Sequence, residues 1–170
     1  MRQIIVIAHN MRSTHNVGSL LRTAEGLAIA KVYLSGYTPY PVTKHDTRLP
    51  HMSAKLTKQI SKTALGAEDL VPWEHTESLP GVIAELKKQG FIVYALEQTP
   101  DSVRLKTLKT PEKVAIILGR EVEGLEQEII DLCDGALEIP MLGHKESYNV
   151  VQAAAMAMYH CRFQDFTWRA

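Results

Sequence analysis

Short apolar runs alternate along the chain with longer segments in which apolar residues recur at helical spacing. The apolar runs predict buried strands at residues 4–8, 31–34, 91–96, 114–118 and 136–139, with a shorter one at 71–73. The helical spacing predicts helices at about residues 17–27, 53–65, 78–89, 125–132 and 148–163. Because strands alternate with helices and several strands are apolar throughout, we expect one α/β domain over residues 1–170, with a mostly parallel sheet and helices on both faces.

Local start and stop signals refine these boundaries. Asn16 or Thr14 is a candidate N-cap of the first helix, because both side chains accept hydrogen bonds from free backbone N–H groups. Ser78 and the proline that follows two residues later are typical of a helix start, and Gly90 is typical of a helix stop. Residues 37–51 are rich in proline, threonine and charge without periodicity, which predicts a loop.

Composition narrows the function classes. Of 170 residues, 45% are hydrophobic, which suffices for one core, and 19 basic residues balance 19 acidic ones. This neutrality argues against a protein that coats nucleic acid nonspecifically, although it allows a local basic patch. Cys133 and Cys161 lack the spacing of metal ligands, so we expect reduced thiols, no metal and a cytoplasmic protein. No apolar stretch suggests a signal peptide or a membrane contact.

Polar residues and glycines gather directly after three of the predicted strands, at residues 9–18, 118–125 and 139–149. Parallel α/β sheets bind ligands at the carboxyl ends of their strands, so these segments are candidate site loops. Each also has an ordinary structural interpretation. Asn16 and Ser147 suit helix caps, Gly119 suits a turn, and Glu121 suits a helix entry.

Taken together, the three segments resemble, in order, the motifs of the SpoU/TrmH family of the SPOUT superfamily. They are Asn16-x-Gly18-x-x-x-Arg22, Leu118-Gly119-x-Glu121-x-x-Gly124, and Ile139-Pro140-Met141 with Ser147-x-Asn149. The resemblance extends from residue 4 to about residue 159. It implies a C-terminal trefoil knot, with knot and cofactor site at about residues 94–163. It also implies S-adenosylmethionine as cofactor and an RNA ribose 2′-hydroxyl as methyl acceptor.

By the same resemblance, individual positions receive roles. The walls of the cofactor site would be Leu96, Gly119, Ile139, Met141, Leu142 and Ser147. The catalytic set would be Arg22, Asn16, Glu121, Ser147 and Asn149. Arg22 is sometimes described as a base in this family, but arginine is effectively always protonated, so clamping a phosphate and stabilising alkoxide charge is the safer role. We expect Asn16 and Asn149 to orient Arg22 and the ribose, and Glu121 to hold Arg22.

Two further features concern partners. A group of cationic residues predicts, with Arg22, a face that binds RNA phosphates: Lys44, Arg48, Lys55, Lys58 and Lys62. A solvated helix beside a loop would explain the same residues. The loop at 36–51 is a candidate specificity element. The last helix is apolar nearly all round, which predicts a homodimer through the knot helices or burial within the monomer.

The choice of RNA rests on family analogy. The chain has little beyond the catalytic domain, as in the tRNA-modifying members, so tRNA is favoured over rRNA. Alternatives are an rRNA 2′-O-methyltransferase, a base-nitrogen methyltransferase, and a noncatalytic RNA-binding factor with the same fold. A Rossmann-type or flavodoxin-like domain lacks support, because the chain has neither a GxGxxG fingerprint nor a GK[ST] loop.

Overall fold

The computed structural model describes residues 1–165. Its strands are β1 (Gln3–His9), β2 (Lys31–Ser35), β3 (Trp73–Thr76), β4 (Ile92–Leu96), β5 (Val103–Arg104), β6 (Lys113–Leu118) and β7 (Gly135–Glu138). Its α-helices are α1 (Thr14–Gly26), α2 (Pro50–Ala64), α3 (Leu79–Lys88), α4 (Gln127–Asp131) and α5 (Val150–Phe163), with 3-10 turns at Ala67–Asp69 and Leu105–Thr107. None of these helices, over the described residues, is long and apolar enough to cross a membrane.

The strands form one seven-stranded sheet in the order β3-β2-β1-β6-β4-β7-β5. All of its strand pairs are parallel, with Ile7 of β1 opposite both Tyr33 of β2 and Ile117 of β6. The predicted mostly parallel α/β architecture is therefore confirmed. Parallel pairing also brings the carboxyl ends of β1, β6, β4 and β7 to one edge of the sheet, which is where the three candidate loops begin.

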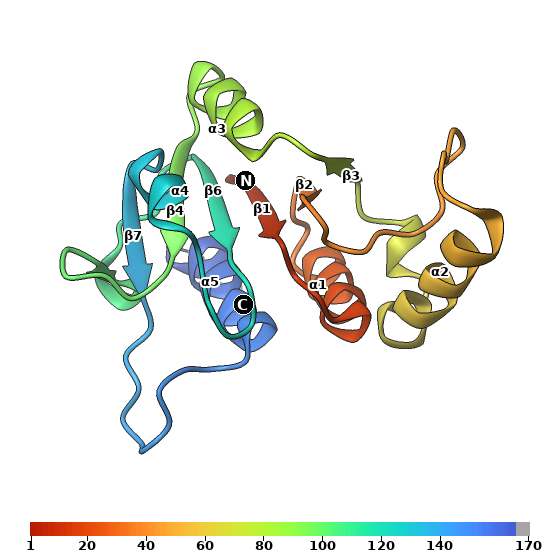
Figure 1. Cartoon of the computed structure of the whole chain (residues 1–170). Helices are drawn as coiled ribbons and strands as arrows, with labels where there is room; N and C mark the ends of the chain where they lie inside the picture. Colours follow the sequence, from red (N-terminus) through yellow and green to blue (C-terminus); the bar gives the residue numbers. More distant parts are fainter. Residues whose placement is uncertain (166–170) are drawn as a thin grey trace, which may run out of the picture.

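The two faces of the sheet are buried by different helices (Figure 1). Successive residues of a strand point to opposite faces, so Ile4, Val6 and Ala8 of β1 join one apolar cluster, whereas Ile5 and Ile7 join another. The first cluster includes residues of α1 and α5, and the second includes residues of α3 and α4. The prediction of helices on both faces is confirmed, and it explains why the central strands are apolar throughout.

The starts of β3 and α1 differ from the prediction, and so does the cap of α1. Strand β3 begins at Trp73, not at Val71, because the N–H of Val71 closes a turn on Ala67 and Pro72 has no N–H to donate. Helix α1 begins at Thr14, and its N-cap is Ser13, whose side chain accepts the N–H of Asn16. Neither Asn16 nor Thr14 is the cap, so the side chain of Asn16 is free for other contacts.

Other local predictions are confirmed, apart from the start of α2. The side chain of Ser78 accepts the N–H of Gly81 at the start of α3, and Gly90 follows that helix with a φ of +83°. Residues 37–49 contain no helix or strand, and α2 begins at Pro50, three residues before the predicted start. Proline suits that first position because its missing N–H has no partner there in any helix.

Gly18 sets the spacing between α1 and α2. A Cβ at this position would lie 2.3 Å from the carbonyl oxygen of Ile60 and 2.9 Å from the nitrogen of Ala64. The hydroxyl of Thr63 donates to the carbonyl of His15 at 2.9 Å across the same contact. Only a residue without a Cβ allows this approach, so Gly18 fixes α2 and its lysines against the helix that carries Asn16 and Arg22.

The last helix, α5, packs against α1 and β1. Its Arg162 is buried and donates hydrogen bonds to the backbone carbonyls of Arg2, Leu27 and Ala28, at 2.8, 2.8 and 2.6 Å. These bonds satisfy carbonyls at the end of α1 and at the start of the sheet. The trefoil knot concerns how the segments before this helix thread past each other, and it stays a prediction.

Candidate functional site

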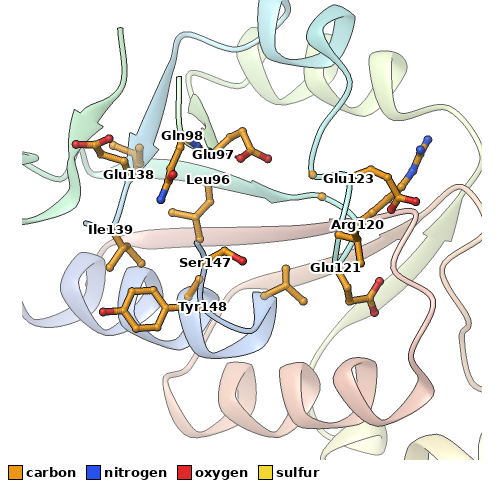
Figure 2. A pocket seen from close by; sticks show the side chains of 16 residues that line it. Leu96, Glu97, Gln98, Arg120, Glu121, Glu123, Glu138, Ile139, Ser147 and Tyr148 are labelled. Atoms are coloured by element: carbon orange, nitrogen blue, oxygen red, sulfur yellow. Dashed lines mark hydrogen bonds between the residues drawn. The ribbon is translucent and has the colours of Figure 1, made fainter. Parts of the chain in front are cut away.

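A hollow of about 180 Å³ opens at the carboxyl edge of the sheet, and we call it the first hollow (Figure 2). The loops after β4, β6 and β7 and the start of α5 line it. Four of the predicted cofactor positions are among its walls, namely Leu96, Gly119, Ile139 and Ser147. Met141 and Leu142 are not, and Leu142 is 96% exposed. The segment 142–149 is exposed throughout and forms the outer rim.

Gly119 is required by the fold of its own loop. A Cβ at Gly119 would lie 2.4 Å from the carbonyl carbon of Gly124 and 2.6 Å from the nitrogen of Leu125. The N–H of Arg120 donates to the carbonyl of Gly124 at 3.1 Å, which folds residues 120–124 back on themselves. Gly119 therefore shapes the wall of the first hollow by letting this loop close.

Glu97 is a wall residue of the first hollow, as the family resemblance implies for the segment Leu96-Glu97-Gln98. Its carboxylate accepts the N–H groups of Gln98 at 3.0 Å and Leu125 at 3.1 Å, so it holds the loop after β4 to the loop after β6. Gly124, with a φ of +69°, leaves room for that carboxylate. Because Glu97 directly follows a buried strand of a parallel sheet, it lies at the edge where such sheets bind ligands.

Glu121 connects the loop after β6 to the start of α1. Its carboxylate accepts the N–H of Ser13 at 3.0 Å, the N–H of Arg12 at 3.2 Å, and the side-chain amide of Asn16 at 3.1 Å. Partial burial acts to raise the pKa of Glu121, but the backbone donors outweigh it, so the pKa lies below its ordinary value. We predicted that Glu121 would hold Arg22, whereas its partners here are Asn16 and the backbone before α1.

Asn149 completes the link to the third motif. Its side-chain oxygen accepts the N–H of Val151 at 3.0 Å and so caps α5. Its amide nitrogen lies 3.5 Å from the side-chain oxygen of Asn16, a long hydrogen bond. Neither asparagine lines the first hollow, but Asn149 lies between the wall residues Tyr148 and Val150. Glu121, Asn16 and Asn149 thus form a continuous polar chain across three segments that lie far apart in the sequence.

Arg22 lies apart from this chain. It is exposed on α1, it does not line the first hollow, and residues 1–165 provide it with no hydrogen-bond or ion-pair partner. The structure therefore brings together Asn16, Glu121, Ser147 and Asn149 but not Arg22. A guanidinium without a partner within the described chain is available for a phosphate.

The predicted cationic residues divide into two groups. Lys44, Lys55, Lys58 and Lys62 are exposed and form no ion pair within residues 1–165, and the spacing of the last three places them on one side of α2. Arg48 differs, because its guanidinium donates to Asp46 and to the carbonyls of Tyr40 and Pro41. Its donors are occupied by its own loop, so a direct phosphate contact is not supported for Arg48.

The chain is similar to known proteins in sequence and in fold. A model described as the SpoU rRNA Methylase family matches residues 3–159. The chain belongs to this family. A Staphylococcus aureus (strain COL) protein named for TrmH family tRNA/rRNA methyltransferases is 30% identical over 155 residues, which cover 91% of this chain and 56% of that protein. The chain thus spans little more than half the length of that relative, and the family resemblance of the three motifs is confirmed.

Solved structures share the fold. The A. aeolicus TrmH/SpoU tRNA modifying enzyme gives a TM-score of 0.78 at 22% identity, over 96% of this chain and 76% of that one. An AdoMet-bound rRNA methyltransferase from Sinorhizobium meliloti gives a TM-score of 0.77 at 18% identity, over 97% and 57% of the two chains. At these identities the likeness establishes the arrangement of sheet and helices.

The lowered pKa of Glu121 predicts a pH-dependent role in stability. A carboxylate whose pKa is lower in the folded than in the unfolded state stabilises the fold at neutral pH. That contribution is lost as the pH falls from the ordinary glutamate value through the folded-state value. We expect Glu121→Gln to unfold at lower urea concentration than the wild type at about pH 7, with the difference shrinking only as the pH falls below about 4.

The matched control is Glu77→Gln, which removes an exposed carboxylate from the loop before α3. Its urea midpoint should follow that of the wild type at every pH. A Glu121→Gln midpoint that stays below the wild type by a constant amount on acidification would contradict the role of the charge.

Proposed function

We propose that this chain transfers a methyl group from S-adenosylmethionine to a ribose 2′-hydroxyl of RNA, with tRNA favoured over rRNA. The observation on which this proposal mainly rests is the polar chain of Glu121, Asn16 and Asn149, of which Glu121 lines the first hollow. Its amide groups are suited to orient a ribose hydroxyl, because an amide both donates and accepts hydrogen bonds. The names of the relatives, which include tRNA and rRNA enzymes, support an RNA substrate.

The residues of the first hollow fit S-adenosylmethionine. Leu96, Leu137 and Ile139 provide apolar surface for an adenine ring, with strand-end backbone groups beside them. Glu97 and Glu121 place negative charge where a sulfonium would be attracted. The enclosed volume of about 180 Å³ is below the about 300–1,000 Å³ of complete ligand sites, so the ligand would extend to the exposed rim, which includes Leu142.

Bound S-adenosylmethionine would supply an electrophilic methyl group for the ribose oxygen, with a neutral thioether as the leaving group. Asn16 and Asn149 would hold that oxygen in position. Glu121 is a weak base, because its carboxylate already accepts several donors and its pKa is lowered. A guanidinium is a donor and not a base, so the role of Arg22 would be to hold a phosphate and to stabilise the forming alkoxide while the proton passes to solvent.

The role of Arg22 leads to a direct test. Arg22→Ala should lower kcat by about a hundredfold or more, because it removes a charge that stabilises the transition state. Cofactor affinity should stay near the wild-type value, since Arg22 does not line the first hollow. The measurement is incorporation of labelled methyl from S-adenosylmethionine into total tRNA and total rRNA, followed by nucleoside analysis.

Two companions sharpen this test. Arg22→Lys keeps the charge but loses the planar fork and should recover only part of the activity. Glu25→Ala, an exposed change on the same helix, should leave activity unchanged. Wild-type turnover by Arg22→Ala would remove Arg22 from the mechanism. Methylated bases in place of methylated riboses would overturn the 2′-O assignment, and a wild-type chain without turnover would favour the RNA-binding alternative.

The exposed lysines of α2 support an RNA-binding face that includes Lys55, Lys58 and Lys62. Phosphate neutralisation releases counterions, so RNA affinity should fall steeply with salt. The double change Lys55→Glu with Lys58→Glu should weaken binding and reduce the slope of log affinity against log salt by about 2. Titration of the chain into total tRNA at several salt concentrations measures both effects.

The control for this test reverses Lys106 and Lys109, which are exposed between β5 and β6 at the other edge of the sheet. Their reversal should leave the salt slope near that of the wild type. A wild-type affinity that does not depend on salt would reject an electrostatic RNA face.

The open side of α5 supports a homodimer. Ala154, Ala157 and Met158 are buried against the rest of the chain, whereas Tyr159 is 58% exposed and Met156 only partly buried. Within residues 1–165, α5 is therefore buried on one side only. A second copy of the chain would cover its other apolar side.

Tyr159→Glu should convert the dimer into a monomer in sedimentation velocity, because a charge would be buried at the contact. Leu70→Glu places a charge at an exposed site next to the turn Ala67–Asp69, so it should leave the dimer intact. A wild-type chain that sediments as a monomer at micromolar concentration would end this part of the proposal.

A further inference from the structure

A second hollow is lined in part by Arg12, whose side chain contacts Glu123 in the wall of the first hollow. Its volume of about 370 Å³ falls within the about 300–1,000 Å³ of small-ligand clefts. Residues 36–40 line it together with Arg12, Thr14, Arg48 and Leu56. None of the residues assigned to the cofactor or to catalysis above is among its walls, so this space has no role in the proposed reaction so far.

The turn that forms its floor is tightly anchored. The hydroxyl of the buried Thr38 accepts the N–H of Met11 at 3.1 Å and contacts two carbonyls at the ends of β1 and β2. The side-chain oxygen of Asn10 accepts the N–H of Tyr37 at 3.2 Å. Gly36 has a φ of +65°, and a Cβ there would lie 2.1 Å from that same oxygen. The second hollow is therefore pre-organised, which reduces the entropy lost on binding.

The two tyrosines of this turn, Tyr37 and Tyr40, differ in how much of the ring surface is open to a ligand. The guanidinium of Arg48 lies 3.6 Å from the centroid of the Tyr40 ring, and the ring of His75 stacks at 3.9 Å. Groups this close to one centroid must lie on opposite faces, so Tyr40 has no face left for a ligand. Tyr37 is 52% exposed, and no ring packs on it within residues 1–165. Tyr37 is thus the aromatic surface available at this site.

Arg12 joins the two hollows. Its backbone N–H donates to Glu121, and its guanidinium lies 3.3 Å from Glu123, which lines the first hollow. The hydroxyl of Tyr37 lies beside this side chain and raises the pKa of Arg12 above its ordinary value by accepting a hydrogen bond. The side chain of Arg12 is 65% exposed, so it can reach a further anion.

The second hollow also lies towards the cationic helix. Leu56 forms part of its wall and belongs to α2, the helix that carries the exposed Lys55 and Lys58. Thr14, at the opposite side, belongs to the first turn of α1, two residues before Asn16. An RNA strand that contacts both these lysines and Asn16 would therefore pass this space.

We propose that the second hollow is an RNA subsite for one unpaired nucleobase near the methylated nucleotide. The base stacks on the Tyr37 ring, and Arg12 contacts an adjoining phosphate. An exposed aromatic face beside a guanidinium suits single-stranded RNA, whose unstacked bases pack on aromatic rings and arginine planes. The subsite rests on the proposed RNA methyltransferase function and adds to it a determinant of which RNA is chosen.

Base stacking can be measured without cofactor or turnover. The probe is a single-stranded RNA oligonucleotide of mixed sequence that carries the fluorescent base 2-aminopurine. Binding to the wild type should quench its fluorescence, and Tyr37→Ala should weaken affinity by about tenfold, as the loss of one base stack does. Tyr37→Trp should retain the quenching, because it keeps a flat aromatic ring, whereas Tyr37→Leu should lose most of it.

Controls separate this proposal from the others. Leu70→Ala, another exposed apolar change, should bind like the wild type, and S-adenosylmethionine affinity should be equal in all variants. Equal quenching by Tyr37→Ala and the wild type would overturn the subsite, as would a Tyr37→Ala variant that changes only the oligomeric state in sedimentation. Failure of methyl transfer with intact Tyr37-dependent quenching would count against the proposed reaction and not against the subsite.

Discussion

The carboxylate of Glu121 is the contact on which the arrangement of the site depends. It accepts two backbone N–H groups from the segment before α1 and the side-chain amide of Asn16, so one residue joins the loop after β6 to the start of α1. This contact is possible because β1 and β6 are parallel neighbours whose carboxyl ends meet at the same edge. Without it, a partly buried group of backbone donors would lose its acceptor, which is costly for any fold.

Glu97 uses the same physical device one strand further along the sheet. Both carboxylates follow a buried strand, and both accept backbone N–H groups of a neighbouring loop. Charged acceptors make shorter and stronger hydrogen bonds than neutral ones, so irregular loops with few apolar contacts can still be held in place. The loops around the first hollow are therefore shaped by carboxylates, with Gly119 and Gly124 providing the space for close approach.

The chain has no net charge, but its acidic and basic side chains lie in separate regions. Acidic side chains such as Glu97, Glu121 and Glu123 surround the first hollow, where the proposed cofactor is cationic at sulfur. The lysines of α2 lie on the helix that Gly18 holds against α1. Arg12 lies between these regions and contacts both the acidic rim and Tyr37. Composition alone hides this arrangement, because it sums charges that the fold separates.

The sequence by itself determined the alternation of strands and helices, since burial on two faces requires apolar strands and amphipathic helices whatever the exact packing. It also determined which loops carry polar residues, and the order of the three motifs gave the family. Tertiary structure decided the partners. Glu121 binds Asn16 and not Arg22, Arg48 is held by Asp46, and Tyr37 remains open while Tyr40 is covered. The pairing of Glu121 with Asn16 joins residues far apart in the chain, whereas that of Arg48 with Asp46 is local. Hydrophobic periodicity contains no information about either, because it reports only which face each residue presents.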